Sequence, residues 1–226
     1  MLESFPMLVS LLVLASNSPR RRQLLALTGR EFFVRPASID EQPHPAEAPG
    51  DYVLRLAMEK AQAAANGSSS LVIGSDTTVA LGMEILGKPA DAAEARAMLT
   101  KLRGREHTVY TAVAVLDPQS GQLRAELCAS RVPMRSYADT EMEAYIDSGD
   151  PLDKAGAYAI QHSEFHPVEG FSGCYASVMG LPLCHLERTF RSLAAPSPAD
   201  VPAACQAELN YRCPIFAAVL RGETAG

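Results

Sequence analysis

The sequence lacks the positive charge that a nucleic-acid-binding surface needs. Lys and Arg number 20 against 26 Asp and Glu, which gives a formal net charge of −6 at pH 7. A protein that binds nucleic acid without sequence preference is basic, so the charge argues against a nucleic-acid polymer as partner. Any phosphate chemistry must therefore come from a local basic pocket.

The sequence also lacks cysteine pairs. The five cysteines are an odd number and widely spread, and none forms a C-x-x-C pair, which excludes a zinc ribbon and a dithiol redox motif. This usage is typical of free or buried thiols in a reducing cytoplasm, where we expect the protein to act. A disulfide or a metal site between Cys205 and Cys213 is the alternative that stays open.

No hydrophobic run is long enough to cross a membrane. The longest apolar stretch near the start, residues 7–15, is far below the roughly 20 residues that a bilayer requires. Glu3 precedes it without any Lys or Arg, which is the wrong charge for a signal peptide. We expect residues 8–15 to form a buried strand and the protein to make no membrane contact.

The order of the predicted elements indicates an α/β fold with a mixed sheet and flanking helices. A hydrophobic content of 47% excludes a disordered chain. We expect strands over residues 8–15, 32–35 and 71–74, a hairpin over 78–86, and paired strands over 108–116 and 123–135. Helices are expected from residue 20 to 27, 52 to 66 (capped by Asp51), 91 to 102 (capped by Asp91), 139 to 148 and 181 to 193. Residues 156–161 are typical of a strand end. From Ala194 a Pro/Ala-rich linker leads to a tail, which we expect to be peripheral.

Two short motifs favour phosphate chemistry. Ser16-Asn17-Ser18-Pro19 precedes three arginines between a strand and a helix, and a helix N-terminus with hydroxyls and guanidiniums binds anions. The motif lacks the glycines and lysine of a P-loop, and the alternative is an ordinary capped helix with solvated arginines. Asp76, which we expect directly after a strand, is placed to hold Mg²⁺ or to orient an attacking water; the alternative is a turn aspartate.

Isolated polar residues add weaker indications. Glu41, Lys60 and Lys88 are single charges in structured contexts, and each taken alone is typical of a surface. Residues 153–161 combine an acid and a base in an otherwise small and apolar stretch, as in the wall of a site. There the amide of Gln161 offers both donors and an acceptor to the edge of a base. Neither H-E-x-x-H nor G-x-S-x-G occurs, so zinc protease and serine hydrolase chemistry are not supported.

Eight motifs in order resemble the Maf family of nucleoside triphosphate pyrophosphatases over about residues 8–193. They are LASNSPRRRQLL (14–25), SIDE (38–41), YVLRLAMEKA (52–61), VIGSDT (72–77), ILGKP (85–89), LRGREHTVYTAVAV (102–115), YIDSGDPLDKAGAYAIQ (145–161) and VMGLPL (178–183). DKAGAYAIQ is similar to the branch that acts on dTTP and UTP. Ser75 and Thr78 depart from the alanine and valine that are commoner in the family, and residues 194–226 have no counterpart.

The resemblance implies two lobes around a central cleft, as in Maf and ITPase-like folds, and a homodimer. It implies hydrolysis of dTTP, UTP and modified pyrimidine nucleotides to the monophosphate and pyrophosphate, which limits incorporation of wrong nucleotides. Asp76 corresponds to the proton acceptor that activates water, and with Glu41 it would bind Mg²⁺ or Mn²⁺. The implied substrate-binding and specificity positions are Ser16, Arg20, Arg21, Lys60, Thr77, Lys88 and Gln161. A non-catalytic nucleotide-binding regulator and a cell-division interaction protein are the alternatives.

Overall fold

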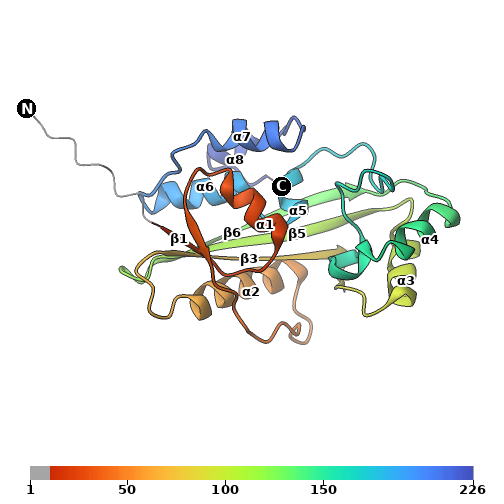
Figure 1. Cartoon of the computed structure of the whole chain (residues 1–226), viewed down its shortest axis with the longest axis horizontal. Helices are drawn as coiled ribbons and strands as arrows, with labels where there is room; N and C mark the ends of the chain where they lie inside the picture. Colours follow the sequence, from red (N-terminus) through yellow and green to blue (C-terminus); the bar gives the residue numbers. More distant parts are fainter. Residues whose placement is uncertain (1–10, 226) are drawn as a thin grey trace, which may run out of the picture.

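A six-stranded mixed sheet forms the centre of the molecule (Figure 1). The computed structural model describes residues 11–225. The strands are β1 (Leu12–Leu14), β2 (Phe32–Val34), β3 (Leu71–Leu81), β4 (Glu84–Leu86), β5 (Glu106–Leu116) and β6 (Leu123–Pro133). Their order is β2-β1-β3-β5-β6, with β4 beside β3. Strand β1 runs parallel to β2 and β3, whereas β3, β4, β5 and β6 pair antiparallel, so the predicted mixed sheet is confirmed.

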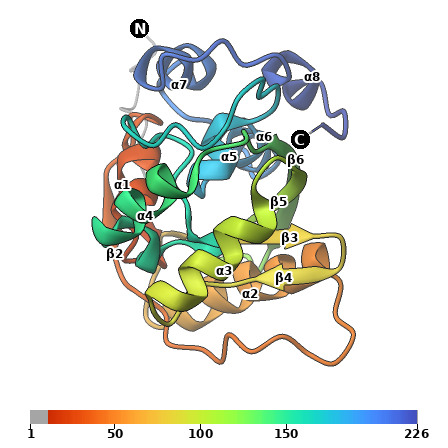
Figure 2. The same ribbon diagram turned by 90° about the vertical axis from the view of Figure 1, so that its right-hand side faces the viewer.

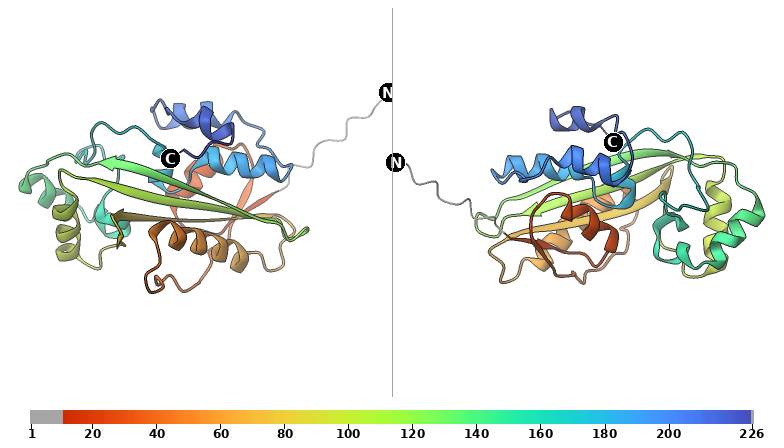
Figure 3. Two further views of the ribbon diagram at one scale, coloured as in Figure 1. Left: turned by 180° about the vertical axis from the view of Figure 1, so that it is seen from behind. Right: turned by 45° about the horizontal axis from the view of Figure 1, so that its top comes forward.

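Helices cover both faces of this sheet. Helix α2 (Pro49–Ala64) packs on one face, and α5 (Tyr175–Met179) and α6 (Leu183–Ser192) pack on the other (Figure 3). Helix α1 (Pro19–Ala26) lies between β1 and β2 in the chain, and α3 (Ala92–Leu102) and α4 (Asp139–Asp147) lie together at one end of the sheet (Figure 2). The flanking helices complete the expected fold class.

Two main apolar clusters lie at opposite ends of the three long strands. One surrounds α6, with Phe190 and Leu186 fully buried, and it includes residues of β1 and α1. The other surrounds α3 and α4, with Tyr137 and Leu99 buried at its centre. Because β3 and β5 contribute to both clusters, the strands connect two lobes, in agreement with the expected architecture.

Strand β3 corrects the sequence interpretation most. The short strand predicted to end at Gly74 instead continues to Leu81, so Asp76 lies in mid-strand and not in a turn after it. The register with β5, in which Asp76 lies opposite Ala112, explains this. Pairing along the whole strand outweighs the local turn tendency of Gly and Asp.

Three further expectations were wrong or shorter than predicted. Helix α2 begins at Pro49 after Ala48, so Asp51 lies in the first turn and does not cap the helix. Residues 156–161 form no strand; the 3-10 helix η2 (Ala155–Ala157) overlaps the start of this segment, and a second one, η1 (Asp150–Asp153), precedes it. Of the strand expected over residues 8–15, only Leu12–Leu14 is formed, and residues 8–10 lie outside the described part.

Gly74 determines how closely α2 approaches β3. A Cβ atom at this position would lie 2.0 Å from the carbonyl oxygen of Ala57 and 2.7 Å from the backbone nitrogen of Ala61. Only glycine permits this contact between helix and strand backbones. The close packing brings Lys60 of α2 within hydrogen-bond distance of Asp76 of β3.

The tail contains two helices that pack on α6. These are α7 (Val201–Glu208) and α8 (Phe216–Leu220), which lie above α6 in Figure 1 and apart from each other in Figure 2. Val201 and Val219 are buried to 1% exposure, so the tail adds to the core and is not peripheral. No helix within residues 11–225 has the length and apolar character needed to cross a membrane.

Candidate active site

A pocket of about 600 Å³ opens between the two lobes. This volume falls in the range of small-molecule sites. The residues predicted for the site come from six separate segments of the chain, and all of them line this pocket: Ser16, Arg20, Arg21, Glu41, Lys60, Asp76, Thr77, Lys88 and Gln161. The structure therefore brings the predicted set together, while the role of each residue stays a prediction.

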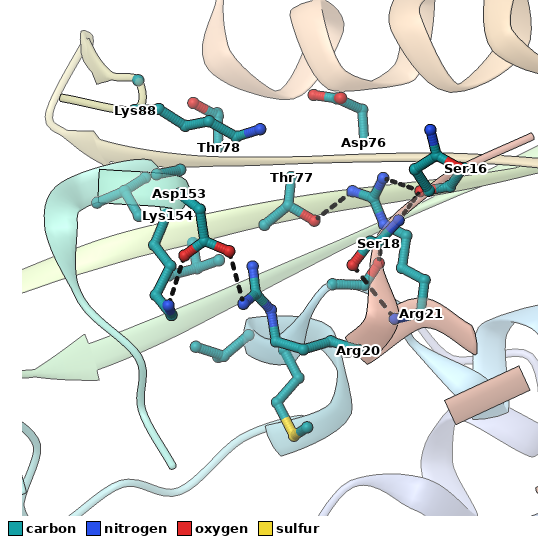
Figure 4. Close-up of a pocket in the computed structure, with 18 of the residues that line it drawn as sticks. Ser16, Ser18, Arg20, Arg21, Asp76, Thr77, Thr78, Lys88, Asp153 and Lys154 are labelled. Carbon is teal, nitrogen blue, oxygen red and sulfur yellow. Dashed lines mark hydrogen bonds and ion pairs between the residues drawn. The ribbon is translucent and has the colours of Figure 1, made fainter. Parts of the chain in front are cut away.

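A notch in the sheet creates the pocket. Strand β1 accompanies β3 only as far as Ile73, and β4 begins to pair with it at Val79. Among the described residues, no strand borders β3 on this side between those two points. Successive side chains of a strand point to opposite faces, and Figure 4 shows Asp76 and Thr77 on opposite sides of β3. The notch lets both line one pocket.

Lys60 joins two carboxylates on the α2 side of the pocket. Its Nζ lies 2.6 Å from Oδ1 of Asp76 and 2.9 Å from Oε1 of Glu41. Lys60 and Asp76 are each only 6% exposed. Burial raises the pKa of Asp76 above its ordinary value, and the positive charges of Lys60 and Arg21 oppose that rise. Asp76 is therefore a stronger base than a surface carboxylate would be.

The two carboxylates fit a divalent cation. Both place an oxygen within hydrogen-bond distance of the same ammonium nitrogen, so they converge on one position of positive charge. No cluster of three or more His, Cys, Asp or Glu side chains suited to a metal occurs within residues 11–225. Mg²⁺ is commonly bound by one or two carboxylates together with substrate phosphates and water, and Asp76 and Glu41 are the two carboxylates of this pocket wall that could supply that protein share.

Arg21 connects the opposite walls of the pocket. Its Nε donates to the carbonyl of Gly180 (2.8 Å), and its two terminal nitrogens donate to the hydroxyls of Ser16 (3.3 Å) and Thr77 (3.2 Å) (Figure 4). Burial lowers the pKa of Arg21. Three of the five guanidinium donors thus hold the pocket together, a structural role that the sequence did not indicate.

The start of α1 supplies an anion site. Ser18 caps the helix by accepting a hydrogen bond from the backbone of Arg21 (3.3 Å), and Pro19 occupies the first turn, both as expected. Arg20 faces the pocket and pairs with Asp153 (3.6 Å). The helix N-terminus and Arg20 together offer positive charge to a phosphate.

The segment opposite α1 forms the predicted wall. Lys154 is 8% exposed, and its Nζ contacts Asp153 (2.5 Å) and Asp150 (2.9 Å). These two carboxylates compensate the charge of the buried ammonium, which would be costly to bury alone. Gln161 and Lys88 line the pocket from exposed positions at its rim.

The sequence analysis missed the residues that hold the loop carrying Glu41. The hydroxyl of Tyr52 donates to the carbonyl of Glu41 (2.9 Å), and Arg55 donates to the carbonyl of Gln42 (3.1 Å). Arg55 also forms two hydrogen bonds to Glu47, of 2.7 and 2.8 Å. Tyr52 and Arg55 lie one turn apart on α2, so their spacing within the YVLRLAMEKA motif indicates that both side chains are on one face of the helix.

Comparisons with known proteins identify the family of the chain. The family model described as "Maf-like protein" matches residues 11–193. The chain is 52% identical over 175 residues to the dTTP/UTP pyrophosphatase of Myxococcus xanthus (strain DK1622), covering 77% of this chain and 88% of that one. It is 49% identical over 177 residues to the protein of the same name from Hahella chejuensis (strain KCTC 2396), covering 76% and 87%. Among solved structures, the Staphylococcus aureus Ham1 protein aligns with a TM-score of 0.44 and 14% identity, covering 72% of this chain and 80% of that one.

Proposed function

The chain belongs to the Maf family, and on that premise we propose that it hydrolyses dTTP and UTP to the nucleoside monophosphate and pyrophosphate. It is a nucleoside triphosphate pyrophosphatase, and modified pyrimidine nucleotides are further substrates. The observation that carries the proposal is the pairing of Lys60 with both Asp76 and Glu41 inside the pocket, in a chain 52% identical to a dTTP/UTP pyrophosphatase.

Asp76 activates the attacking water. Its carboxylate accepts a proton while the water oxygen bonds to the α-phosphorus, and the bond from the α-phosphorus to the bridging oxygen breaks to release pyrophosphate. Lys60 holds Oδ1 of Asp76 at 2.6 Å and so fixes the orientation of the carboxylate. The raised pKa of Asp76 makes it a better proton acceptor than a solvated carboxylate.

Basic groups bind the phosphates. Arg20 and the N-terminus of α1 face the pocket from one side, and Lys88 faces it from another. These charges stabilise the pyrophosphate as negative charge develops on it. The pair between Arg20 and Asp153 is long at 3.6 Å, which leaves Arg20 able to turn to a phosphate oxygen.

Asp76 and Glu41 would hold a divalent cation, Mg²⁺ or Mn²⁺. When bound, it neutralises phosphate charge and favours attack at phosphorus. Thr77, which lies on the other side of β3 from Asp76, recognises the base together with Gln161. The homodimer implied by the family resemblance and the cytoplasmic location expected from the cysteine usage complete the proposal.

A screen of pyrophosphate release over nucleoside triphosphates, with Mg²⁺ or Mn²⁺, tests the activity. We expect release from dTTP and UTP, and we expect Asp76→Asn to abolish it while nucleotide binding and the fold persist. Asp147→Asn, the same change at an exposed position on α4, serves as the matched control and retains activity. Unchanged turnover in Asp76→Asn would refute the role of Asp76. Tight nucleotide binding without any release by the wild type would identify the non-catalytic regulator instead.

A further inference from the structure

The segment around α5 forms one wall of the nucleotide pocket. Val178, Met179 and Gly180 line it directly. The carbonyl of Gly180 accepts hydrogen bonds from Arg21 (2.8 Å) and Ser75 (3.0 Å). A displacement of Gly180 would therefore move the guanidinium of Arg21, which also contacts Ser16 and Thr77 in the pocket.

A second contact ties the same wall to Thr77. The hydroxyl of Thr111 donates to the carbonyl of Ser177 (2.8 Å) and lies 3.1 Å from the hydroxyl of Thr77. Gly180 has a φ of 116°, and a Cβ atom there would contact Arg21 and Thr77 at 3.4 and 3.5 Å. The position of α5 thus determines how Thr77 and Arg21 are presented to a ligand.

The tail holds the residues that lead into α5. The hydroxyl of Tyr211, between α7 and α8, lies 3.1 Å from both the backbone nitrogen and the backbone oxygen of Gly173. Its ring packs against Phe171 and Tyr175, with centroid distances of 5.7 and 5.3 Å. Gly173 is buried, so its backbone groups depend on these hydrogen bonds.

The tail that carries Tyr211 is itself fixed to the core. Val201 and Cys205 are buried in the cluster around α6, and Arg188 of α6 donates to the carbonyls of Val219 (2.9 Å) and Glu223 (3.0 Å). At the end of α7, close to Tyr211 in the chain, Glu208 accepts a hydrogen bond from Gln23 of α1 (2.7 Å). Because these contacts fix the tail to α6 and α1, Tyr211 can hold Gly173 in place.

We infer that the C-terminal tail braces the wall of the nucleotide pocket through Tyr211, which acts as a positioning residue for substrate binding. Tyr211 lies after the residues that match the family model, so this brace is a feature added to the family's domain. The inference rests on the proposed function for its ligand. It assigns to the tail an effect on nucleotide affinity, while Asp76, Lys60 and Glu41 on the α2 side retain their contacts.

The test compares two Tyr→Phe substitutions. Tyr211→Phe removes only the hydroxyl that bonds Gly173. Tyr137→Phe is the matched control, because its hydroxyl also bonds a buried backbone group (the carbonyl of Leu99, 2.7 Å), and neither Tyr137 nor Leu99 lines the pocket. Deletion of residues 194–226 is the less suitable variant, since it would expose the core around α6.

The measurements are the dissociation constant of the α,β-imido analogue of dUTP, and KM and kcat for dTTP. We expect Tyr211→Phe to weaken analogue binding about fivefold (about 1 kcal/mol) and to raise KM similarly with kcat within about twofold. Tyr137→Phe should lower thermal stability and leave binding within about twofold of wild type. Wild-type affinity in Tyr211→Phe, or an equal loss in both variants, would overturn the inference.

Hydrogen exchange separates this inference from the proposed function. We expect the amides of residues 173–180 to exchange faster in Tyr211→Phe, with those of α3 unchanged. If the wild type neither binds the analogue nor releases pyrophosphate, the proposed function fails, and unchanged exchange at residues 173–180 would show that the brace fails as well. Faster exchange there without any nucleotide binding would support the brace and refute its assigned ligand.

Discussion

Lys60→Met tests whether the buried ammonium is required to keep a charged Asp76 in the core. The two groups lie 2.6 Å apart and each is 6% exposed. Removing one partner of a buried ion pair leaves an uncompensated charge, which typically destabilises a protein by about 3–5 kcal/mol. Methionine retains most of the apolar length of the lysine side chain, so the expected loss arises mainly from charge. We expect a loss in this range near neutral pH.

The loss should depend on pH with a definite sign. Burial raises the pKa of Asp76 in the folded state, and Lys60 opposes that rise, so Lys60→Met raises the pKa of Asp76 further. A carboxyl group whose pKa is higher in the folded than in the unfolded state stabilises the fold while it is protonated, and this stability is lost as pH rises through the folded pKa. The deficit of Lys60→Met relative to wild type is therefore smaller at pH 5 than at pH 8.

A second substitution separates charge from packing. In Lys60→Met/Asp76→Asn the uncompensated charge is gone, so we expect most of the lost stability to return although pyrophosphate release stays abolished. Urea unfolding at pH 5 and pH 8, followed by circular dichroism, measures the free energy of unfolding of the wild type, Lys60→Met, Asp76→Asn and the double variant. A deficit that is equal at both pH values and is not recovered by Asp76→Asn would refute the argument from charge.

Two further changes test the packing around this site. Gly74→Ala should destabilise the protein by about 3 kcal/mol or more in urea unfolding, because the new Cβ would clash with the backbone of Ala57, which cannot move aside as a side chain could. A loss under about 1 kcal/mol would contradict the close approach of α2 to β3. Arg55 holds the pKa of Glu47 at about 2, below its ordinary value of 4.5, so the stability from this pair is present above about pH 4.5 and lost as pH falls toward 2. The difference in melting temperature between wild type and Glu47→Gln should accordingly shrink from pH 5 to pH 2, and a constant difference would count against the pair.

Local signals in the sequence were sufficient for several elements. Ser18 and Asp91 begin α1 and α3 as predicted, because a capping side chain and its helix lie within a few residues of each other. The turn 117–121 joins β5 to β6 for the same reason. Strand β3 was not predictable in this way. Its continuation past Gly74 depends on pairing with β5 and contact with α2, and both partners are distant in sequence.

The candidate site shows the same limit. The family motifs identified residues that line one pocket, but they did not reveal which side chains hold those residues in place. The pair of Arg55 and Glu47 was not predicted, because Glu47 lies before α2 in a segment without regular structure. Tyr211 lies in a segment without any motif, and only the folded chain brings it to Gly173.

The uninterrupted course of β3 has a consequence for motion within the molecule. Asp76 and Thr77 are consecutive residues of one paired strand, so their separation stays constant when the two lobes move relative to each other. Arg20 and Gln161 lie on separate segments and have no such constraint. A relative movement of the two lobes would therefore change the width of the pocket, whereas the spacing between Asp76 and Thr77 along β3 would not change.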